Sequence, residues 1–240
     1  MGDVSFYHTG PDGYLARQKG GVSGDRIKND SQFERTRENG EEFGNANEAA
    51  RLVRNSLRAL IAGAADSRMV SRFGARMIAI AKSDSTSVRG KRNVADGDLT
   101  LLQGFEFNVA GKLAQTLYVV CTPTVDRVAG TATINLPAFV PQDMIAAPPG
   151  ATHARLVSGV ASVDFRAKTY TVVTAKSADI VLGPQEQPTV NLTHLVGPNN
   201  TRPLFVALGI DFLQDINGAL YPLKVGSFNA LSLIAVDTVE

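Results

Sequence analysis

The chain of 240 residues is long enough to bury a sizeable core, as one large domain or two small ones. Its hydrophobic content of 44% is ordinary for a soluble globular protein, and its net charge of +1 argues against a globally basic nucleic-acid binder. The single cysteine, Cys121, excludes an internal disulfide framework; in its strand-like surroundings we expect a buried, inert thiol.

The opening stretch GDVSFYHTGPDGYLARQKGG predicts a β-hairpin. Val4, Phe6 and His8 alternate with polar or amphipathic neighbours, and the segment Gly10-Pro11-Asp12-Gly13 has the chemistry of a tight turn. A lone two-stranded hairpin is marginally stable in water. We therefore expect it to pack on something else, either its own chain or a neighbouring one.

Residues 20–44 hold five glycines and almost no aliphatic side chains, which favours an extended arm. Within the arm, Ser31 and Glu34 have the spacing of a capping box, which predicts a short helix ending near Arg37. The rest of the arm is expected to depend on contacts made elsewhere.

Residues 45–82 carry apolar side chains at helical spacing and predict a helical hairpin. Asn45 is expected to cap the first helix, Gly63 to end it and Asp66 to cap the second. The polar residues 83–98 are expected to form a linker.

From about residue 99 the pattern changes to short alternating runs separated by turn signals, among which the Asn217-Gly218 pair is a strong hairpin signal. About ten strands at this spacing favour an antiparallel β-sandwich, with a barrel as second choice. The expected fold is mainly β with an N-terminal helical part (α+β). Its domains are a hairpin and arm (1–44), a helical hairpin and linker (45–98) and a sandwich (99–240).

No catalytic or cofactor-binding motif stands out. His8, His153 and His194 are isolated from other metal-ligating residue types, so we expect structural or surface histidines and no metal site. Asp211 and Asp215 would share one side of a strand, where a solvated face is favoured over acid–base work. We therefore expect a protein that is not an enzyme and needs no cofactor.

Arginine recurs at helical spacing on both predicted helices. Such stripes can contact phosphates, so a nucleic-acid partner is one alternative. The other is that the arginines cover the apolar seam or pair with Glu34, Glu38, Glu41 and Glu42 of the arm. The possible nucleic-acid contacts are Arg51, Arg54, Arg58, Arg68, Arg72 and Arg76; Arg89, Lys91 and Arg92 add basic charge in the linker.

Five stretches resemble a family of uncharacterised proteins from Bacteroidetes. They are GDVSFYHTGPDGYLARQKGG, DRIKNDSQFERTRENGEEFG, ADSRMVSR, GKRNVADGD and NGALYPLKVGSFNALSL, and they are distributed from residue 2 to residue 233 of the chain. The resemblance implies a bacterial source and transfers no catalytic residue.

A tethered hairpin followed by a charged arm is typical of elements with which subunits hold their neighbours. The leading hypothesis is a self-assembling structural protein, a filament, tube or shell subunit, whose partners are other copies of itself. Nucleic-acid binding and a ligand- or carbohydrate-binding sandwich are the alternatives. We expect a cytoplasmic protein without membrane insertion, and export by a route not encoded at the N-terminus stays open. The expected interface residues are Phe6, Tyr7, Tyr14, Leu15, Arg17, Phe33, Arg35, Arg37 and Phe43.

Overall fold

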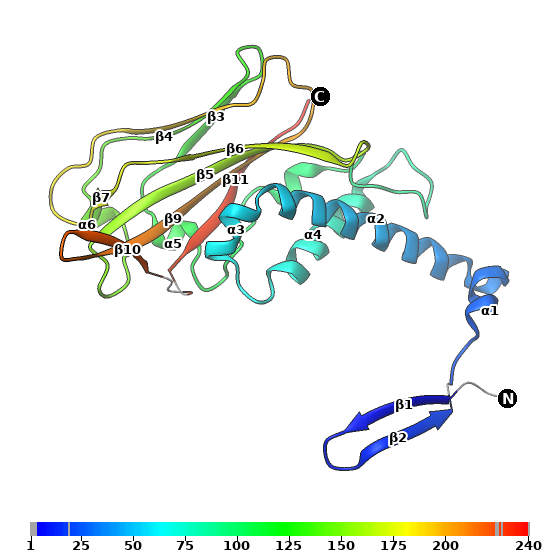
Figure 1. Ribbon diagram of the computed structural model, residues 1–240. Helices are drawn as coiled ribbons and strands as arrows, with labels where there is room; N and C mark the ends of the chain where they lie inside the picture. Colours follow the sequence, from blue (N-terminus) through cyan, green and yellow to red (C-terminus); the bar gives the residue numbers. More distant parts are fainter. Residues whose placement is uncertain (1–3, 19, 224–225, 227, 240) are drawn as a thin grey trace.

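The computed structural model describes residues 4–18, 20–223, 226 and 228–239. It has an N-terminal hairpin, a helical segment and a body of two antiparallel sheets (Figure 1). The helices are α1 (Gly24–Asn29), α2 (Glu34–Ser56), α3 (Arg58–Ala64), α4 (Met69–Ser83), α5 (Leu113–Thr116) and α6 (Pro141–Met144), with 3-10 turns η1 (Ser31–Phe33) and η2 (Leu99–Leu102). The strands are β1 (Val4–Thr9), β2 (Gly13–Gln18), β3 (Thr122–Asp126), β4 (Thr131–Leu136), β5 (His153–Asp164), β6 (Thr169–Lys176), β7 (Ile180–Val181), β8 (Val190–Leu195), β9 (Leu204–Ile216), β10 (Ala219–Leu223) and β11 (Ala230–Asp237).

Two long strands, β5 and β9, form the centre of the larger sheet and pair with each other. On the edge that faces away from β5, β9 pairs with β11 and β10. On the edge that faces away from β9, β5 pairs with β6 and β7. The smaller sheet has the order β3-β4-β8 and packs face to face on the larger one. This confirms the expected antiparallel sandwich in a mainly β chain with helices before it.

The central strands of the larger sheet, β5 and β9, are buried on both faces, so the body has three layers there. Alternate side chains such as Leu156 and Ile210 pack against the small sheet, while Phe205 and Ala161 pack against the helices. Because both faces are covered, β5 and β9 are almost continuously apolar rather than alternating apolar and polar.

Small residues at the interface allow the helices to pack closely on the larger sheet. Ala46, Ala50 and Val53 of α2 are fully buried against the core, and Gly159 of β5 lies under the junction of α2 and α3. A Cβ at Gly159 would be 2.8 Å from Leu60 Cδ1, so the missing side chain allows the close approach.

The arm is helical, and the prediction of an extended arm is wrong for residues 24–44. Ser23 caps α1, and Asp30 rather than Ser31 caps the following turn by accepting a bond from Gln32 N at 2.9 Å. The first long helix, α2, begins at Glu34 instead of Asn45. Arg37 Nη1 donates to the carbonyls of Ile27 and Asp30 at 2.7 and 2.8 Å, which fixes α1 against the start of α2.

Several local predictions are confirmed and others need correction. Asn217 and Gly218 have φ of 55° and 84° and join β9 to β10, as the pair predicts. The Asp66 carboxylate accepts from Arg68 N at 2.7 Å just before α4. Two of the short alternating runs seen after residue 99, at residues 153–157 and 162–164, belong to one strand, β5. Two others, at residues 105–109 and 117–121, are not strands, although the first exchanges backbone hydrogen bonds with Leu231 and Leu233 of β11.

Candidate functional site

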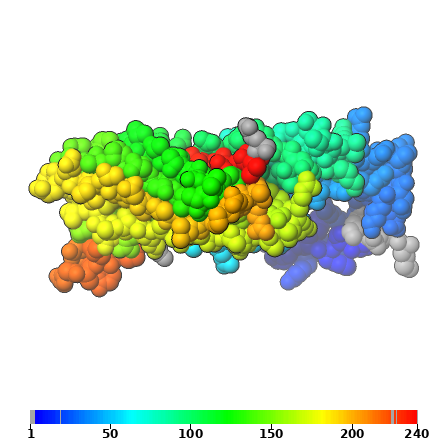
Figure 2. Space-filling view, turned by 90° about the horizontal axis from the view of Figure 1, so that it is seen from above, coloured from blue at the N-terminus to red at the C-terminus, as the bar shows by residue number. Residues whose placement is uncertain are grey.

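The β1–β2 hairpin stands apart from the body, at the N-terminal end of α2 (Figure 1). Among the described residues, its hydrogen bonds and ring contacts are all internal, including His8 against Tyr14 at 4.8 Å and Arg17 over Tyr7 at 5.5 Å. Figure 2 shows the blue N-terminal segment at one end of an elongated molecule. The fold of the body therefore does not hold the hairpin in place.

Both faces of the hairpin carry apolar side chains exposed to solvent. The pairing of His8 with Tyr14 and of Phe6 with Ala16 places these four residues on one face. On that face the exposed fractions are 80% for Phe6 and 87% for Tyr14. Aromatic side chains are normally buried, so this exposure marks the face as an interaction surface.

The remaining expected interface residues have different surroundings. Arg35 is exposed, and Phe43 has an exposed fraction of 58% on α2. Phe33 is half-buried under Arg26, whose guanidinium carbon is 5.9 Å from the ring centroid. The Arg37 guanidinium donates hydrogen bonds to the Ile27 and Asp30 carbonyls of its own chain. Tyr7, Leu15 and Arg17 lie together on the second face of the hairpin.

Ion pairs fix the N-terminal half of α2 to the segment after α4. Glu42 is buried and accepts from Arg92 Nε and Nη2 at 2.8 and 2.9 Å and from Gly90 N at 2.8 Å. Pairing of the helical arginines with the arm acids was one alternative, but the acids Glu38, Glu41 and Glu42 pair with linker residues instead. The two further pairs are Glu38 with Arg89 at 3.2 Å and Glu41 with Lys91 at 2.6 Å.

The linker is itself ordered by a buried carboxylate, Asp84. It accepts from Thr86 N at 2.9 Å, Ser87 N at 3.0 Å and Asn93 N at 3.1 Å. Burial alone would raise the pKa of Asp84, but the hydrogen bonds from Ser87 and Thr86 hold it far below its ordinary value. Residues 84–98 are therefore a fixed brace against α2 rather than a loose connection.

The helical arginines do not form one free basic stripe. Arg72 forms an ion pair with Asp66 at 2.6 Å and donates a hydrogen bond to the Glu106 carbonyl at 2.7 Å. Arg54 is half-buried, and burial lowers its pKa. The exposed members are Arg51, Arg58, Arg68 and Arg76. Nucleic-acid binding stays a prediction, with fewer available cations than the sequence implied.

The ligand-binding alternative has no aromatic platform on the outer face of the small sheet. Strand pairing places threonine and asparagine there, with Asn135 Nδ2 donating to Asn191 Oδ1 at 2.6 Å and Thr133 across from Thr193. Carbohydrate sites commonly use exposed aromatic faces, so this alternative also stays a prediction.

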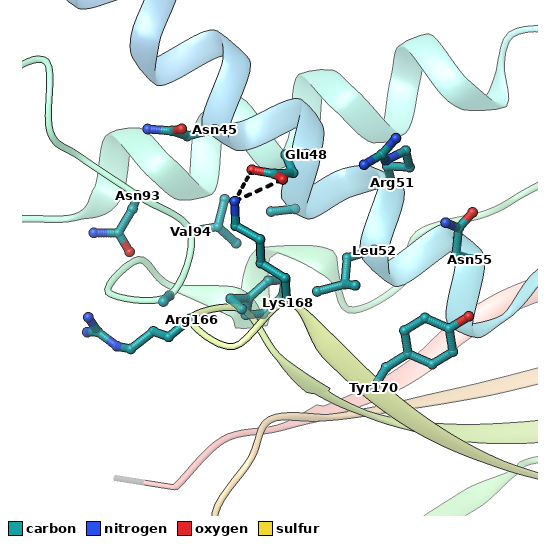
Figure 3. Close-up of a pocket in the computed structure, with 13 residues that line it drawn as sticks. Asn45, Glu48, Arg51, Leu52, Asn55, Asn93, Val94, Arg166, Lys168 and Tyr170 are labelled. Atoms are coloured by element: carbon teal, nitrogen blue, oxygen red, sulfur yellow. Dashed lines mark hydrogen bonds and ion pairs between the residues drawn. The ribbon is translucent and has the colours of Figure 1, made fainter.

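A groove of about 540 Å³ runs between α2 and the turn that joins β5 to β6 (Figure 3). Its wall on α2 includes Asn45, Leu52 and Asn55, and its opposite wall includes Phe165 and Tyr170. Three segments far apart in sequence form it, so sequence reasoning did not find it. Its further lining residues are Glu48, Ala49, Arg51, Asn93, Val94, Ala95, Arg166 and Lys168.

The charges in the groove are mostly compensated. Lys168 reaches across to Glu48, with Nζ to oxygen distances of 2.9 and 3.0 Å (Figure 3). Arg166 pairs with Asp96 at 2.5 Å. Arg51 is exposed and has no hydrogen bond or ion pair with any described residue. The groove thus combines apolar side chains with polar ones whose charges are mostly paired, and among the described residues that line it Arg51 is the available cation.

The histidines and carboxylates singled out by sequence are not assembled into a site. His194 is buried between the sheets, with Nε2 2.9 Å from Ser158 Oγ and Nδ1 3.2 Å from the Ala132 carbonyl, and burial lowers its pKa. Burial raises the pKa of Asp211, whereas Asp215 accepts from Gly218 N in the β9–β10 turn at 2.8 Å. In the part of the chain that the structure describes, no three His, Cys, Asp or Glu side chains gather as metal ligands.

None of the described helices has both the length and the apolar character needed to cross a membrane. Comparisons with protein-family models, curated proteins and solved structures found no match for the chain. The function is therefore argued from the geometry of the hairpin, α2 and the groove.

Proposed function

We propose that this protein is a non-enzymatic structural subunit that assembles with copies of itself into a filament, tube or shell. The hairpin and the helices that carry it are the connecting element. The observation that supports this is an aromatic hairpin face, with Phe6 and Tyr14 exposed, on a segment whose hydrogen bonds and ring contacts with described residues are all internal. The bacterial setting comes from the sequence resemblance alone.

Energetics favour a docked hairpin over a free one. An isolated two-stranded hairpin is marginally stable, and each strand has an unpaired outer edge. Burying one large apolar side chain contributes about 1.5–3 kcal/mol. Docking of Phe6 and Tyr14 on a neighbour would thus stabilise both the contact and the hairpin itself.

The hairpin is carried on a rigid support and attached by a short tether. The tether, residues 20–23, includes Gly20 and Gly21, so the hairpin can orient toward a neighbour. Behind the tether, α1 is fixed to α2, and α2 is braced by the Glu42–Arg92 pair. A contact between the hairpin of one copy and the body of the next is heterologous, which gives a ring or an open helical polymer.

The test is the particle mass of the full chain beside a variant lacking residues 1–22, by light scattering with negative-stain imaging. We expect large ordered particles from the full chain and monomers from the shortened one. Phe6→Ser with Tyr14→Ser should act like the deletion. Val128→Ser is the matched control, because Val128 is also exposed, at 78%, but lies in the β3–β4 turn. A full chain that stays monomeric at high concentration would contradict the proposal.

A further inference from the structure

We propose that the groove between α2 and the β5–β6 turn is the site that receives the hairpin of a neighbouring copy. This inference rests on the proposed function and names its second surface. Each copy would then offer one hairpin and one groove.

The floor of the groove suits aromatic side chains. Leu52 and Phe165 are half-buried, Val94 is buried beneath them, and Tyr170 has an exposed fraction of 40%. These apolar side chains of the floor and walls would cover the exposed rings of Phe6 and Tyr14, which no described residue of their own chain covers. Ring–ring contacts with Phe165 and Tyr170 would add to the burial of apolar area.

The rim of the groove suits a polypeptide backbone. Asn45 and Asn55 are exposed on α2, and neither side chain forms a hydrogen bond with a described residue. An asparagine amide both donates and accepts, as a strand edge requires. The ten residue steps from Asn45 to Asn55 span about 15 Å of helix, which is the length of about five residues of a strand. Strands β1 and β2 have six residues each, so either outer edge matches this length. A docked strand would displace the partly exposed Lys168–Glu48 pair, which crosses the groove between the two asparagines.

A charge on the rim that no described residue compensates has a counterpart on the hairpin. Arg51 is exposed without a partner among the described residues. Asp12, at the tip of the hairpin, is also exposed and has no hydrogen bond or ion pair with a described residue. A hairpin lying along α2 would bring these opposite charges together, which fixes its direction in the groove.

A second copy fits this groove better than the chain's own hairpin. Arg37 fixes α1 at the N-terminal end of α2, so the tether leaves the molecule beyond that end. The groove lies along the other half of the helix, from Asn45 to Asn55. Binding in trans therefore joins the hairpin of one subunit to the groove of the next. The same contact can then repeat from subunit to subunit.

The test uses two single-cysteine chains in a Cys121→Ser background, mixed and treated with a short bis-maleimide. One chain carries Ala16→Cys on the aromatic face of the hairpin, and the other carries Asn45→Cys or Asn55→Cys on the rim. We expect crosslinked dimers of the two different chains at least tenfold above those formed with a Val128→Cys control. Adding Phe6→Ser to the hairpin chain should remove the excess.

Particle mass measured on the same samples separates the two proposals. Large particles without excess crosslinking would overturn the groove as the docking site while leaving self-assembly in place. In a third chain that carries both Ala16→Cys and Asn45→Cys, crosslinking only within one chain would overturn docking in trans. Monomers in every sample would overturn it too, and would also contradict the proposed function. Excess crosslinking at either rim position, in samples that form large particles, supports both self-assembly and docking in the groove.

Discussion

Glu42 and Arg92, fifty residues apart in the chain, form a two-pronged ion pair that joins α2 to the segment after α4. The hydrogen bonds from Arg92 hold the pKa of Glu42 below its ordinary value, against the opposing effect of burial. Since Glu42 also accepts from Gly90 N, one carboxylate orders two backbone segments.

We expect Glu42→Gln to lower the melting temperature by about 4 °C, because it removes the charge that compensates Arg92. Its neighbour provides the control: Glu41 pairs with Lys91, but the two side chains have exposed fractions of 48% and 65%. Glu41→Gln should shift the melting temperature by less than about 1 °C. Equal shifts for the two variants would contradict a special role for the buried pair.

Two glycines should respond to alanine in opposite directions. A Cβ at Gly97 would be 2.1 Å from the Ile80 carbonyl oxygen, so Gly97→Ala should reduce the free energy of unfolding by about 2–3 kcal/mol. Gly40 lies inside α2 with nothing within 4 Å, so Gly40→Ala should increase it by about 0.5–1 kcal/mol. Urea unfolding measures both. A destabilising Gly40→Ala would mean that residue 40 is not helical.

The buried His194 should make the protein less stable as the pH falls below about 6.5, the ordinary pKa of histidine. Burial lowers the pKa of His194 in the folded state, so the unfolded state binds a proton first as the pH decreases. The contribution of neutral His194 to the stability of the fold is thus complete above that pH and is lost below it. Urea unfolding at pH 7.5 and 5.5 should give a smaller difference for His194→Gln than for the unmodified chain. The hairpin variant His8→Gln, outside both cores, should retain the full difference.

Cys121 should resist thiol reagents in the folded protein. Burial raises the pKa of its thiol to about 11, so at pH 8 only about one thiol in a thousand is ionised. Reaction with a chromogenic disulfide reagent should be at least about 100-fold slower than for free cysteine, and should become fast in urea. Rapid reaction without denaturant would show that the thiol is accessible.

The features that sequence predicts well depend on neighbouring residues. The turn Gly10–Gly13 and the Asn217-Gly218 pair specify hairpins through their own backbone preferences, and both hairpins form. The helix from Glu34 was missed in part because Gly40 and Gly44 weaken helix propensity. Its stability comes from partners about fifty residues away, which no local pattern reveals.

One part of the candidate site can be predicted from the sequence and the other part cannot. The hairpin and its aromatic residues are evident in the sequence because alternation and turn chemistry are local signals. The groove is not, because Leu52, Val94 and Tyr170 come from three separate segments. The arginine periodicity was visible, but whether an arginine is free depends on packing, and Arg72 is already used by Asp66 and the Glu106 carbonyl.

The bracing of α2 also determines how mechanical load would pass through the molecule. A pull on the hairpin acts first on residues 20–23 and then along α2, whose 23 residues span about 35 Å. The three ion pairs from Glu38 to Glu42 resist sliding of the helix, and its buried alanines transmit the remaining force to the central sheet. Under tension the tether straightens before any layer of the body separates, so an assembled structure would bend at its joints while each subunit keeps its shape.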